Sequence, residues 1–248
     1  MTESDLDTSG QSLYIGPMEK WPLRLGKLLF RFRSFTPLPL ILLTFVFFRP
    51  VSPASRWTFI GLAFAFLGEG VRMASVGFAG SGTSGRESFL KADSLNTAGL
   101  YSLARNPLYW GNGLIFAGLL VMFANHWALA LFVAFLFLQY HFIVLAEESF
   151  LSQRHGQAYA GYCGRVRRWL PRFDRWAPPP APFDWKRVLF KENDSCFNLL
   201  LAALLILAWK ERHYNGTVRH PVLLAVAALL LVLFYAGIKV LKKRRAAA

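Results

Sequence analysis

Residues 108–146 read LYWGNGLIFAGLLVMFANHWALALFVAFLFLQYHFIVLA, in which two apolar runs are separated only by Ala124-Asn125-His126. Three residues leave room for a tight reversal, so the runs 108–123 and 127–146 are expected to form an antiparallel helical hairpin. The second run has the roughly 20 residues that a helix needs to cross the hydrocarbon of a bilayer. The hairpin therefore predicts a membrane protein in which the residues just before 108 and just after 146 lie at one membrane face.

The composition of the 248-residue chain supports a membrane assignment. The chain is 54% hydrophobic and has a formal net charge of +14. A soluble domain rarely combines such a charge with repeated apolar runs near bilayer length. Four further runs are expected to form helices, at 35–48, 57–79, 196–209 and 221–241. We therefore predict an all-α fold, an integral membrane helical bundle with about six transmembrane helices.

Lysine and arginine are distributed unevenly between the two sides of this predicted bundle. One side, made of 1–34, 80–107, 147–195 and the end of the chain from 239, holds 22 of the 28 Lys and Arg residues. The cytoplasmic side of a membrane protein carries the excess of positive charge. Both termini and the two segments that flank the hairpin are therefore expected in the cytoplasm.

Two features follow the hairpin. Beyond Glu148, apolar and aromatic residues recur at helical spacing up to Tyr162, which predicts a cytoplasmic amphipathic helix lying on the membrane surface. The proline-rich sequence APPPAP at 177–182 breaks helices and predicts a linker. The chain is accordingly divided into a cytoplasmic N-terminal segment, a membrane core, a Pro-rich linker with a cytoplasmic segment, and a C-terminal transmembrane hairpin with a basic tail, at 1–34, 35–176, 177–195 and 196–248.

Polar residues gather in two stretches that flank the hairpin. The first motif, 95–112, reads LNTAGLYSLARNPLYWGN, and the second motif, 147–171, reads EESFLSQRHGQAYAGYCGRVRRWLP. Charge near hydrocarbon is costly to hold, so such a gathering indicates a functional site. Glu69 and Arg72, inside the run 57–79, are three residues apart and can face one another on a helix. They are interpreted either as a structural ion pair or as part of the site.

The two motifs carry a family resemblance. The first fits the pattern Gly-x-Tyr-x-x-x-Arg-His-Pro-x-Tyr-x-Gly, with matches at Gly99, Tyr101, Arg105, Pro107, Tyr109 and Gly111. The second fits Glu-Glu-x-x-Leu-x-x-x-(Phe/His)-Gly-x-x-Tyr-x-x-Tyr and a basic stretch ending in Leu-Pro, with matches at Glu147, Glu148, Leu151, Gly156, Tyr159, Tyr162, Arg168, Leu170 and Pro171. Over about residues 60–172 the chain resembles the isoprenylcysteine carboxyl methyltransferase and phospholipid methyltransferase superfamily of membrane enzymes. Asn106 stands where the pattern usually has His, and a neutral amide cannot supply a titrating imidazole.

The resemblance implies that S-adenosyl-L-methionine binds at the cytoplasmic membrane face between the two motifs, and that a lipid or lipid-linked acceptor enters from the bilayer. The residues expected to be catalytic are Arg105 and Glu148. The expected cofactor-binding residues are Asn106, Pro107, Tyr109, Glu147, Glu148, Tyr159 and Tyr162. The expected substrate-binding residues are Glu69, Arg72, Arg86 and Arg168. No nucleic-acid partner is expected, and the oligomeric state is left open.

These side chains suit the charges of the expected cofactor. The two glutamates can meet the sulfonium, the ammonium or the ribose hydroxyls, and Arg105 can meet the carboxylate or an anionic acceptor. Tyr109 or Tyr159 can meet the adenine or the sulfonium with an aromatic face. No cluster of His, Cys or carboxylates has metal-ligand spacing, so no metal is expected.

The sequence leaves more than one possibility for the methyl acceptor and for the function class. Thr83-Ser84-Gly85-Arg86, followed by Leu95-Asn96-Thr97, resembles a bacterial subgroup related to lipid A 1-phosphate methyltransferases, which favours a bacterial inner membrane and an anionic phosphate or carboxylate headgroup. A second possibility is an NADPH-dependent membrane sterol or enone reductase, although the doubled Glu is not its pattern. A third is a non-catalytic transport or scaffold protein in which Glu69 and Arg72 line a pathway.

Overall fold

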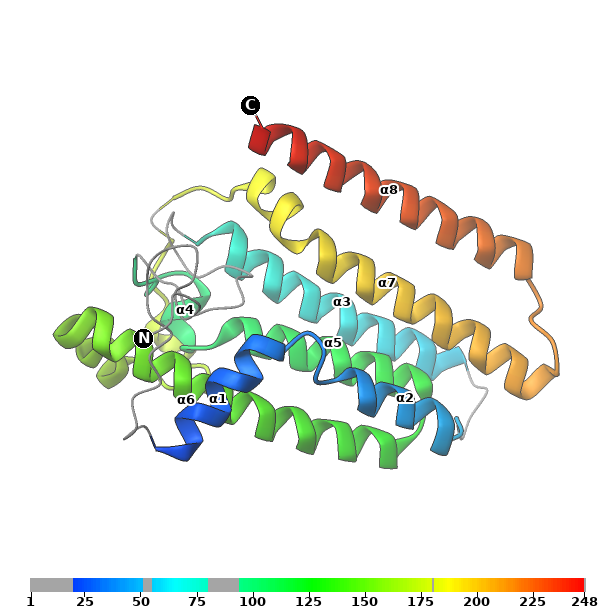
Figure 1. The fold of residues 1–248 in the computed structure, drawn as a ribbon, viewed down its shortest axis with the longest axis horizontal. Coiled ribbons are helices and arrows are strands. Elements are labelled where there is room, and N and C mark those ends of the chain that lie inside the picture. Colours follow the sequence, from blue (N-terminus) through cyan, green and yellow to red (C-terminus); the bar gives the residue numbers. More distant parts are fainter. Residues whose placement is uncertain (1–19, 51–54, 80–93, 180, 248) are drawn as a thin grey trace, which may run out of the picture.

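The computed structural model describes residues 20–50, 55–79, 94–179 and 181–247. All regular secondary structure within these ranges is helical, which confirms the predicted all-α fold (Figure 1). The elements are α1 (Trp21–Phe32), α2 (Leu38–Phe47), α3 (Ser55–Gly77), α4 (Leu100–Leu103), α5 (Pro107–Phe123), α6 (His126–Arg165), the 3-10 turn η2 (Phe173–Arg175), α7 (Trp185–Asn215) and α8 (Pro221–Ala247). The candidate substrate residue Arg86 and the sequence Thr83-Ser84-Gly85-Arg86 lie outside the described residues.

Four of the described helices are long and apolar enough to cross a membrane, namely α3, α6, α7 and α8. Helices α2 and α5 are apolar but have only 10 and 17 residues. With a rise of 1.5 Å per residue, α2 is about 15 Å long, which is half of a typical ~30 Å hydrocarbon core. The chain is thus an integral membrane helical protein, but the predicted count of six transmembrane helices is not confirmed.

The hairpin predicted from the opening sequence is present as α5 and α6. Ala124 ends α5 with φ 58° and ψ 41°, and the Asn125 side chain caps α6 by accepting hydrogen bonds from the backbone N–H groups of Trp127 and Ala128 at 3.1 and 3.0 Å. The Asn125 amide also donates to the carbonyl oxygen of Arg49 at 2.7 Å. One buried asparagine therefore supplies the helix cap and ties the turn to the chain that follows α2.

Helix α6 is longer than the predicted run 127–146 and includes most of the surface helix predicted after Glu148. Its 40 residues form two helical stretches joined by a kink at Gly156, whose φ of 47° and ψ of −120° are not helical and suit a residue without a Cβ. The chain after Glu148 is thus helical as predicted, with a kink at Gly156 that its pattern did not reveal, and its position on a membrane surface stays a prediction. After the bend, visible at the end of α6 in Figure 1, Tyr159 and Tyr162 are buried in a cluster with Leu95 and Leu151.

Glycines allow α3 and α5 to pack very closely. An ideal Cβ on Gly68 would lie 2.6 Å from the carbonyl oxygen of Gly111, and one on Gly118 would lie 2.5 Å from the amide nitrogen of Ala65. Small residues let membrane helices approach until their backbones touch. This contact sets the position of α5, and hence of the first motif, relative to Arg72 on α3.

Helix α7 extends well beyond the predicted run 196–209 in both directions. Asp184 caps its first turn by accepting a hydrogen bond from the backbone N–H of Arg187 at 2.9 Å. Residues 185–195, predicted as cytoplasmic chain, therefore form the first turns of a long helix. Helix α8 packs against α7 at the edge of the bundle and exposes most of its apolar side chains, as a helix in contact with lipid does (Figure 1).

Helix α1 lies within the segment 1–34, for which no helix was predicted. It packs along α6, where an ideal Cβ on Gly26 would lie 2.9 Å from the Cβ of Ala146, and its Phe30 is buried. Proline in its first turn suits the start of a helix, because the N–H groups there have no partner within the helix.

Figure 1 shows which parts of the chain meet at each end of the bundle. Helix α4, the end of α6, the start of α7 and the end of α8 gather at one end. The α5–α6 and α7–α8 turns lie at the other. Both motifs therefore lie at the same end of the bundle.

Candidate active site

A cavity of about 960 Å³ lies at the end of the bundle that holds the motifs and extends between the helices. Among the predicted site residues, the following line it: Arg72, Arg105, Asn106, Tyr109, Glu147, Glu148, Tyr159 and Tyr162. Glu69, Pro107 and Arg168 do not form part of its lining, and Arg86 is outside the described residues. The cavity thus joins most of the predicted cofactor residues, whereas two of the predicted substrate residues, Glu69 and Arg168, lie outside its lining.

Hydrogen bonds to the backbone hold the two motifs side by side. The Arg105 N–H donates to the carbonyl oxygen of Arg167 at 2.9 Å, and the Arg172 N–H donates to that of Leu103 at 3.0 Å. Between them, the Asn106 side-chain amide donates to the carbonyl oxygen of Arg168 at 3.1 Å. The chain before α5 and the chain after α6 are therefore neighbours, as the hairpin predicts.

Glu148 is the centre of a charged cluster in the second motif. Its Oε1 accepts a hydrogen bond from Arg168 Nε at 3.0 Å, and its Oε2 lies 2.5 Å from Arg168 Nη2. Arg105 Nη2 lies 3.4 Å from Oε1 of the same carboxylate. A two-bond contact between guanidinium and carboxylate fixes the orientation of both groups. Glu148 therefore holds one arginine from each motif in a defined position.

Arg105 is largely buried and has one donor to spare. Its Nη1 donates to the sulfur of Cys163 at 2.6 Å, while its buried Nε has no hydrogen-bond partner among the described residues. Although burial lowers it, the pKa of Arg105 is raised overall, because the Glu148 carboxylate and the Cys163 sulfur favour the charged guanidinium. A buried cationic group with an unused donor is suited to bind an anion.

Glu147 has a different environment from its neighbour Glu148. Its Oε1 accepts a hydrogen bond from the Tyr109 hydroxyl at 3.0 Å. The Tyr109 ring in turn packs against the ring of Tyr140 at a centroid distance of 4.7 Å. Glu147 therefore lines the cavity beside a tyrosine hydroxyl, whereas Glu148 is engaged directly with two guanidinium groups.

Tyr162 links the bent end of α6 to the first motif. Its hydroxyl donates to the carbonyl oxygen of Tyr101 at 2.7 Å, and its ring lies 6.1 Å from that of Tyr159. Both rings line the cavity next to the Glu148 cluster. Burial, followed by the nearby charge of Glu147, raises the pKa of Tyr101, so this phenol stays neutral in the physiological range.

A second charged cluster joins α3 to α7. Glu192 Oε2 accepts hydrogen bonds from Arg72 Nε and Nη2 at 2.9 and 2.6 Å, and the exposed fractions of the two side chains are 3% and 12%. Arg72 also donates to the side-chain oxygen of Asn112, at the end of the first motif. Arg72 therefore sits in the cavity wall between α5 and α7, held by partners from both.

Glu69 does not pair with Arg72 as its spacing suggested. Its carboxylate instead accepts hydrogen bonds from the Ser195 hydroxyl at 2.7 Å and from the Cys196 thiol at 3.1 Å, both on α7. The spacing of three residues allows two side chains to meet, but the polar start of α7 offers closer partners for each. The predicted pair is thus replaced by two separate contacts to α7.

The sequence interpretation missed the contribution of α7 and α8 to the cavity. Residues from these helices that line it include Arg187, Lys191, Glu192, Asp194, Ser195, Asn198, Tyr235 and Lys239. The signal was present as polar residues at 187, 191, 194, 195 and 198, which share a helix face. It was overlooked because 177–195 was interpreted as linker and cytoplasmic chain, to which no helical period was applied.

Fold and site together define a membrane protein with a charged cavity at one end of a helical bundle. Residues 57–158 match the model of a family described as phospholipid methyltransferase. This segment, which runs from α3 through most of α6 and covers less than half of the chain, is similar to that family, which is part of the isoprenylcysteine carboxyl methyltransferase superfamily, and the match confirms the resemblance drawn from the motifs. The match does not confirm the predicted resemblance to the lipid A 1-phosphate methyltransferase subgroup. Comparisons with curated proteins and with solved structures gave no match.

The family match bears on the choice between the function classes. It implies a membrane methyltransferase, and among the three classes considered it supports neither a reductase nor a transport or scaffold protein. The matched segment contains Arg105, Asn106, Tyr109 and both glutamates. It ends before Tyr159, so the bent end of α6 and the whole of α7 and α8 lie beyond it.

Proposed function

We propose that this protein is an S-adenosyl-L-methionine-dependent methyltransferase that acts on a lipid or lipid-linked acceptor at the cytoplasmic face of a membrane. The main support is one juxtaposition. Arg105 from the first motif and Glu147 and Glu148 from the second line the same cavity. The positive-charge bias of this end of the bundle supports a cytoplasmic location.

The residues present suit this cofactor. The unused buried Nε of Arg105 can bind its carboxylate, and the Glu147 carboxylate can bind its cationic groups. The rings of Tyr159 and Tyr162 offer apolar faces for the adenine or for the sulfonium. When bound, the cofactor supplies an electrophilic methyl group on a sulfonium.

The two adjacent glutamates are assigned different roles. Glu147 is proposed to contact the cofactor, because it lines the cavity and accepts a hydrogen bond from the Tyr109 hydroxyl, whereas both oxygens of Glu148 are engaged by Arg168. Glu148 is proposed as a positioning residue that acts through Arg105 and Arg168, since its two oxygens are already bonded to those guanidinium groups. The expected catalytic role of Glu148 is thus refined to holding Arg105 in place.

The residues of the site favour alignment over proton transfer. A methyl group is displaced in line, so the protein must orient the acceptor and exclude water. Asn106 cannot serve as a general base, because its amide does not titrate and its nitrogen is committed to the Arg168 carbonyl. This arrangement favours an acceptor that is already ionised at neutral pH, such as a phosphate or carboxylate.

The apolar part of the cavity supports a lipid acceptor. Leu38, Ile41 and Phe45 of α2 line one side, and Leu205 and Ile206 of α7 line another. Such a lining suits acyl or prenyl chains, because burial of apolar surface favours binding by about 25 cal/mol per Å². A headgroup near the motifs and chains along this part would occupy the cavity as one amphiphile.

The proposal can be tested with the full chain in lipid nanodiscs. The protein is incubated with methyl-labelled cofactor and a panel of lipids that carry phosphate, carboxylate or amine headgroups, and label in the lipid fraction is measured. We expect label on a lipid and none with Arg105→Ala. A wild-type protein that neither binds the cofactor nor labels any lipid would refute the methyltransferase assignment. Label on amines only would refute the preference for an ionised acceptor.

A further inference from the structure

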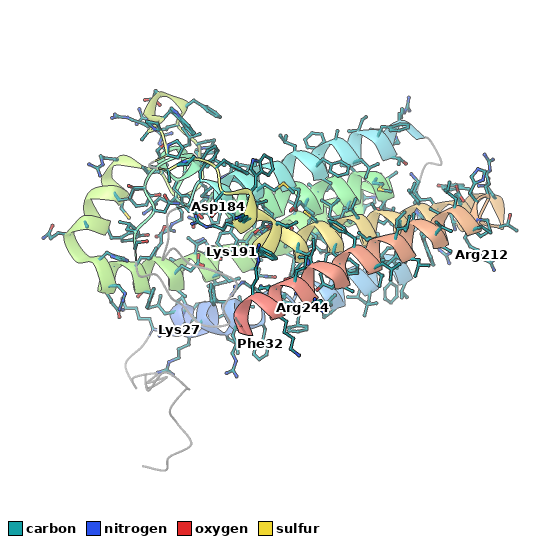
Figure 2. All side chains as sticks on the ribbon, turned by 90° about the horizontal axis from the view of Figure 1, so that it is seen from above. Lys27, Phe32, Asp184, Lys191, Arg212 and Arg244 are labelled. Carbon is teal, nitrogen blue, oxygen red and sulfur yellow. The ribbon has the colours of Figure 1, made fainter. Side chains whose placement is uncertain are left out.

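Helices α7 and α8 lie outside the family match, yet they build a whole wall of the cavity. Three of its cationic side chains, Arg187, Lys191 and Lys239, come from these two helices. Figure 2 shows Asp184 and Lys191 near the start of α7, far from Arg212 near its other end. This cationic group therefore lies at the motif end of the bundle, on a wall that the matched family segment does not provide.

The face that α7 turns toward the cavity changes from charged to apolar along the helix. Arg187 and Lys191 are followed by Asp194, Ser195 and Asn198, and the lining continues as Leu201, Ala202, Leu205 and Ile206. With a rise of 1.5 Å per residue, the polar part is about 17 Å long and the apolar part about 8 Å. One helix face thus matches the profile of an amphiphile, with a polar head next to apolar chains.

The charges on the cavity wall leave an excess of cations. Six Lys and Arg side chains and four Asp and Glu side chains line the cavity. Three of the pairs are direct: Arg72 with Glu192 at 2.6 Å, Arg105 with Glu148 at 3.4 Å, and Lys239 with Asp194 at 2.7 Å. Arg187 has a looser contact, 3.7 Å from the carboxylate of Asp184. Counting that carboxylate, which lies outside the lining, the wall keeps a formal excess of one positive charge, which favours an anionic ligand.

The polar part of α7 is held in place from two sides. Glu192 binds Arg72, and Ser195 donates to Glu69, so that α3 fixes one side of the helix. On the other side, the Asp194 carboxylate accepts a hydrogen bond from the Tyr235 hydroxyl at 2.8 Å and pairs with Lys239 of α8. Such anchoring keeps the cationic wall at a fixed distance from the motifs, which a binding site requires.

We propose that Arg187 and Lys191, with Lys239 beside them, form a subsite for the phosphate of a phospholipid whose chains lie along the apolar face of α7. This inference rests on the proposed function, since the bound lipid would be the methyl acceptor. The phosphate could belong to a lipid or be free in solution. The continuation of the same helix face into an apolar lining favours the lipid.

The experiment uses the full chain in detergent with photoactivatable lipids of identical chains: phosphatidic acid, phosphatidylethanolamine and diacylglycerol. Affinity for each lipid is measured, and the cross-linked peptides are identified by mass spectrometry. Cofactor affinity is measured separately by calorimetry. The test variant is Arg187→Ala with Lys191→Ala. Its matched control is Lys186→Ala with Lys242→Ala, which removes the same charge from exposed positions outside the cavity.

We expect both phospholipids to cross-link to α7 and α2, and diacylglycerol to bind far more weakly. The test variant should lose about tenfold or more in phospholipid affinity, as expected for removal of charged hydrogen-bond donors. The control variant should bind phospholipid as the wild type does. Arg187→Lys with Lys191→Arg keeps both positive charges and should retain binding, which distinguishes loss of charge from a folding defect.

Several results would overturn the subsite. These are equal binding of diacylglycerol, equal loss in the control variant, or binding of phosphatidylethanolamine alone. Full displacement of the lipid by inorganic phosphate would assign the cations to a free anion and overturn the lipid assignment. Phospholipid binding without any cofactor binding would support the subsite while refuting the proposed methyl transfer, so the two failures are distinguishable.

Discussion

The cavity has two charged walls that are assembled in different ways. In the first, Arg105, Glu148 and Arg168 come from two motifs that flank a single hairpin and are tied by backbone hydrogen bonds. In the second, Arg72 and Glu192 are 120 positions apart and meet only because α7 packs beside α3. The residues of the first wall come from two polar stretches at the open end of the α5–α6 hairpin. Those of the second wall are isolated polar residues on the long helices α3 and α7.

The largest effect is expected from breaking the first wall with Glu148→Ala. Arg105 and Arg168 would lose their shared carboxylate, and we expect methyl transfer to fall by at least about a hundredfold, since small misplacement of an orienting group costs this much. Transfer of label to lipid gives the rate, and circular dichroism checks the fold. Asp174→Ala, which removes an exposed carboxylate paired with Arg172, should keep the wild-type rate. A Glu148→Ala rate close to that of the wild type would contradict the positioning role.

The second wall is tested by a double-mutant cycle on Arg72 and Glu192. Arg72→Met or Glu192→Leu alone leaves a buried charge without its partner and should lower the free energy of unfolding by about 3 kcal/mol. The double variant should be more stable than the sum of the two losses implies. Unfolding in mixed micelles measures all four proteins. Additive losses would mean that the pair does not couple α3 to α7.

A smaller effect is expected from the close contact of α3 and α5 at Gly68 and Gly111, and the neighbouring Gly113 serves as the control. An ideal Cβ on Gly111 would lie 2.8 Å from the Gly68 carbonyl oxygen and would also meet the Arg72 side chain. Gly111→Ala should therefore lower the free energy of unfolding by about 1–3 kcal/mol. A Cβ on Gly113 meets nothing within 4 Å, so Gly113→Ala should be neutral or stabilising by up to ~1 kcal/mol. Equal thermal stability of the two variants would be evidence against close packing here.

The smallest effect is expected for Tyr109→Phe, which removes one hydrogen bond to Glu147. We expect cofactor affinity to change only several-fold, consistent with about 1 kcal/mol for a single hydrogen bond. Calorimetric titration of the cofactor measures it. Tyr214→Phe serves as control, because that hydroxyl binds the Pro50 carbonyl at the other end of the bundle. If both variants bound the cofactor equally to the wild type, the assignment of Glu147 would be weakened.

The sequence predicted the fold class and the first wall because the relevant signals are local. A turn of three residues forces a hairpin, and the hairpin forces its two flanks together. It did not predict the kink in α6 beyond Glu148, where amphipathic spacing predicted a helix but not the change in its direction. The non-helical backbone at Gly156 directs the chain back onto the bundle, and a periodic pattern does not reveal such a bend.

The sequence by itself determined that this chain is helical, that it belongs in a membrane, and that Arg105 approaches Glu148. Hydrophobic length and turn length carry that information over short distances along the chain. Only the tertiary structure decided that Glu192 pairs with Arg72, that Glu69 turns to Ser195, and that α7 completes the cavity. These contacts depend on which faces of distant helices meet, and helix packing is set by the shapes of all the side chains between them.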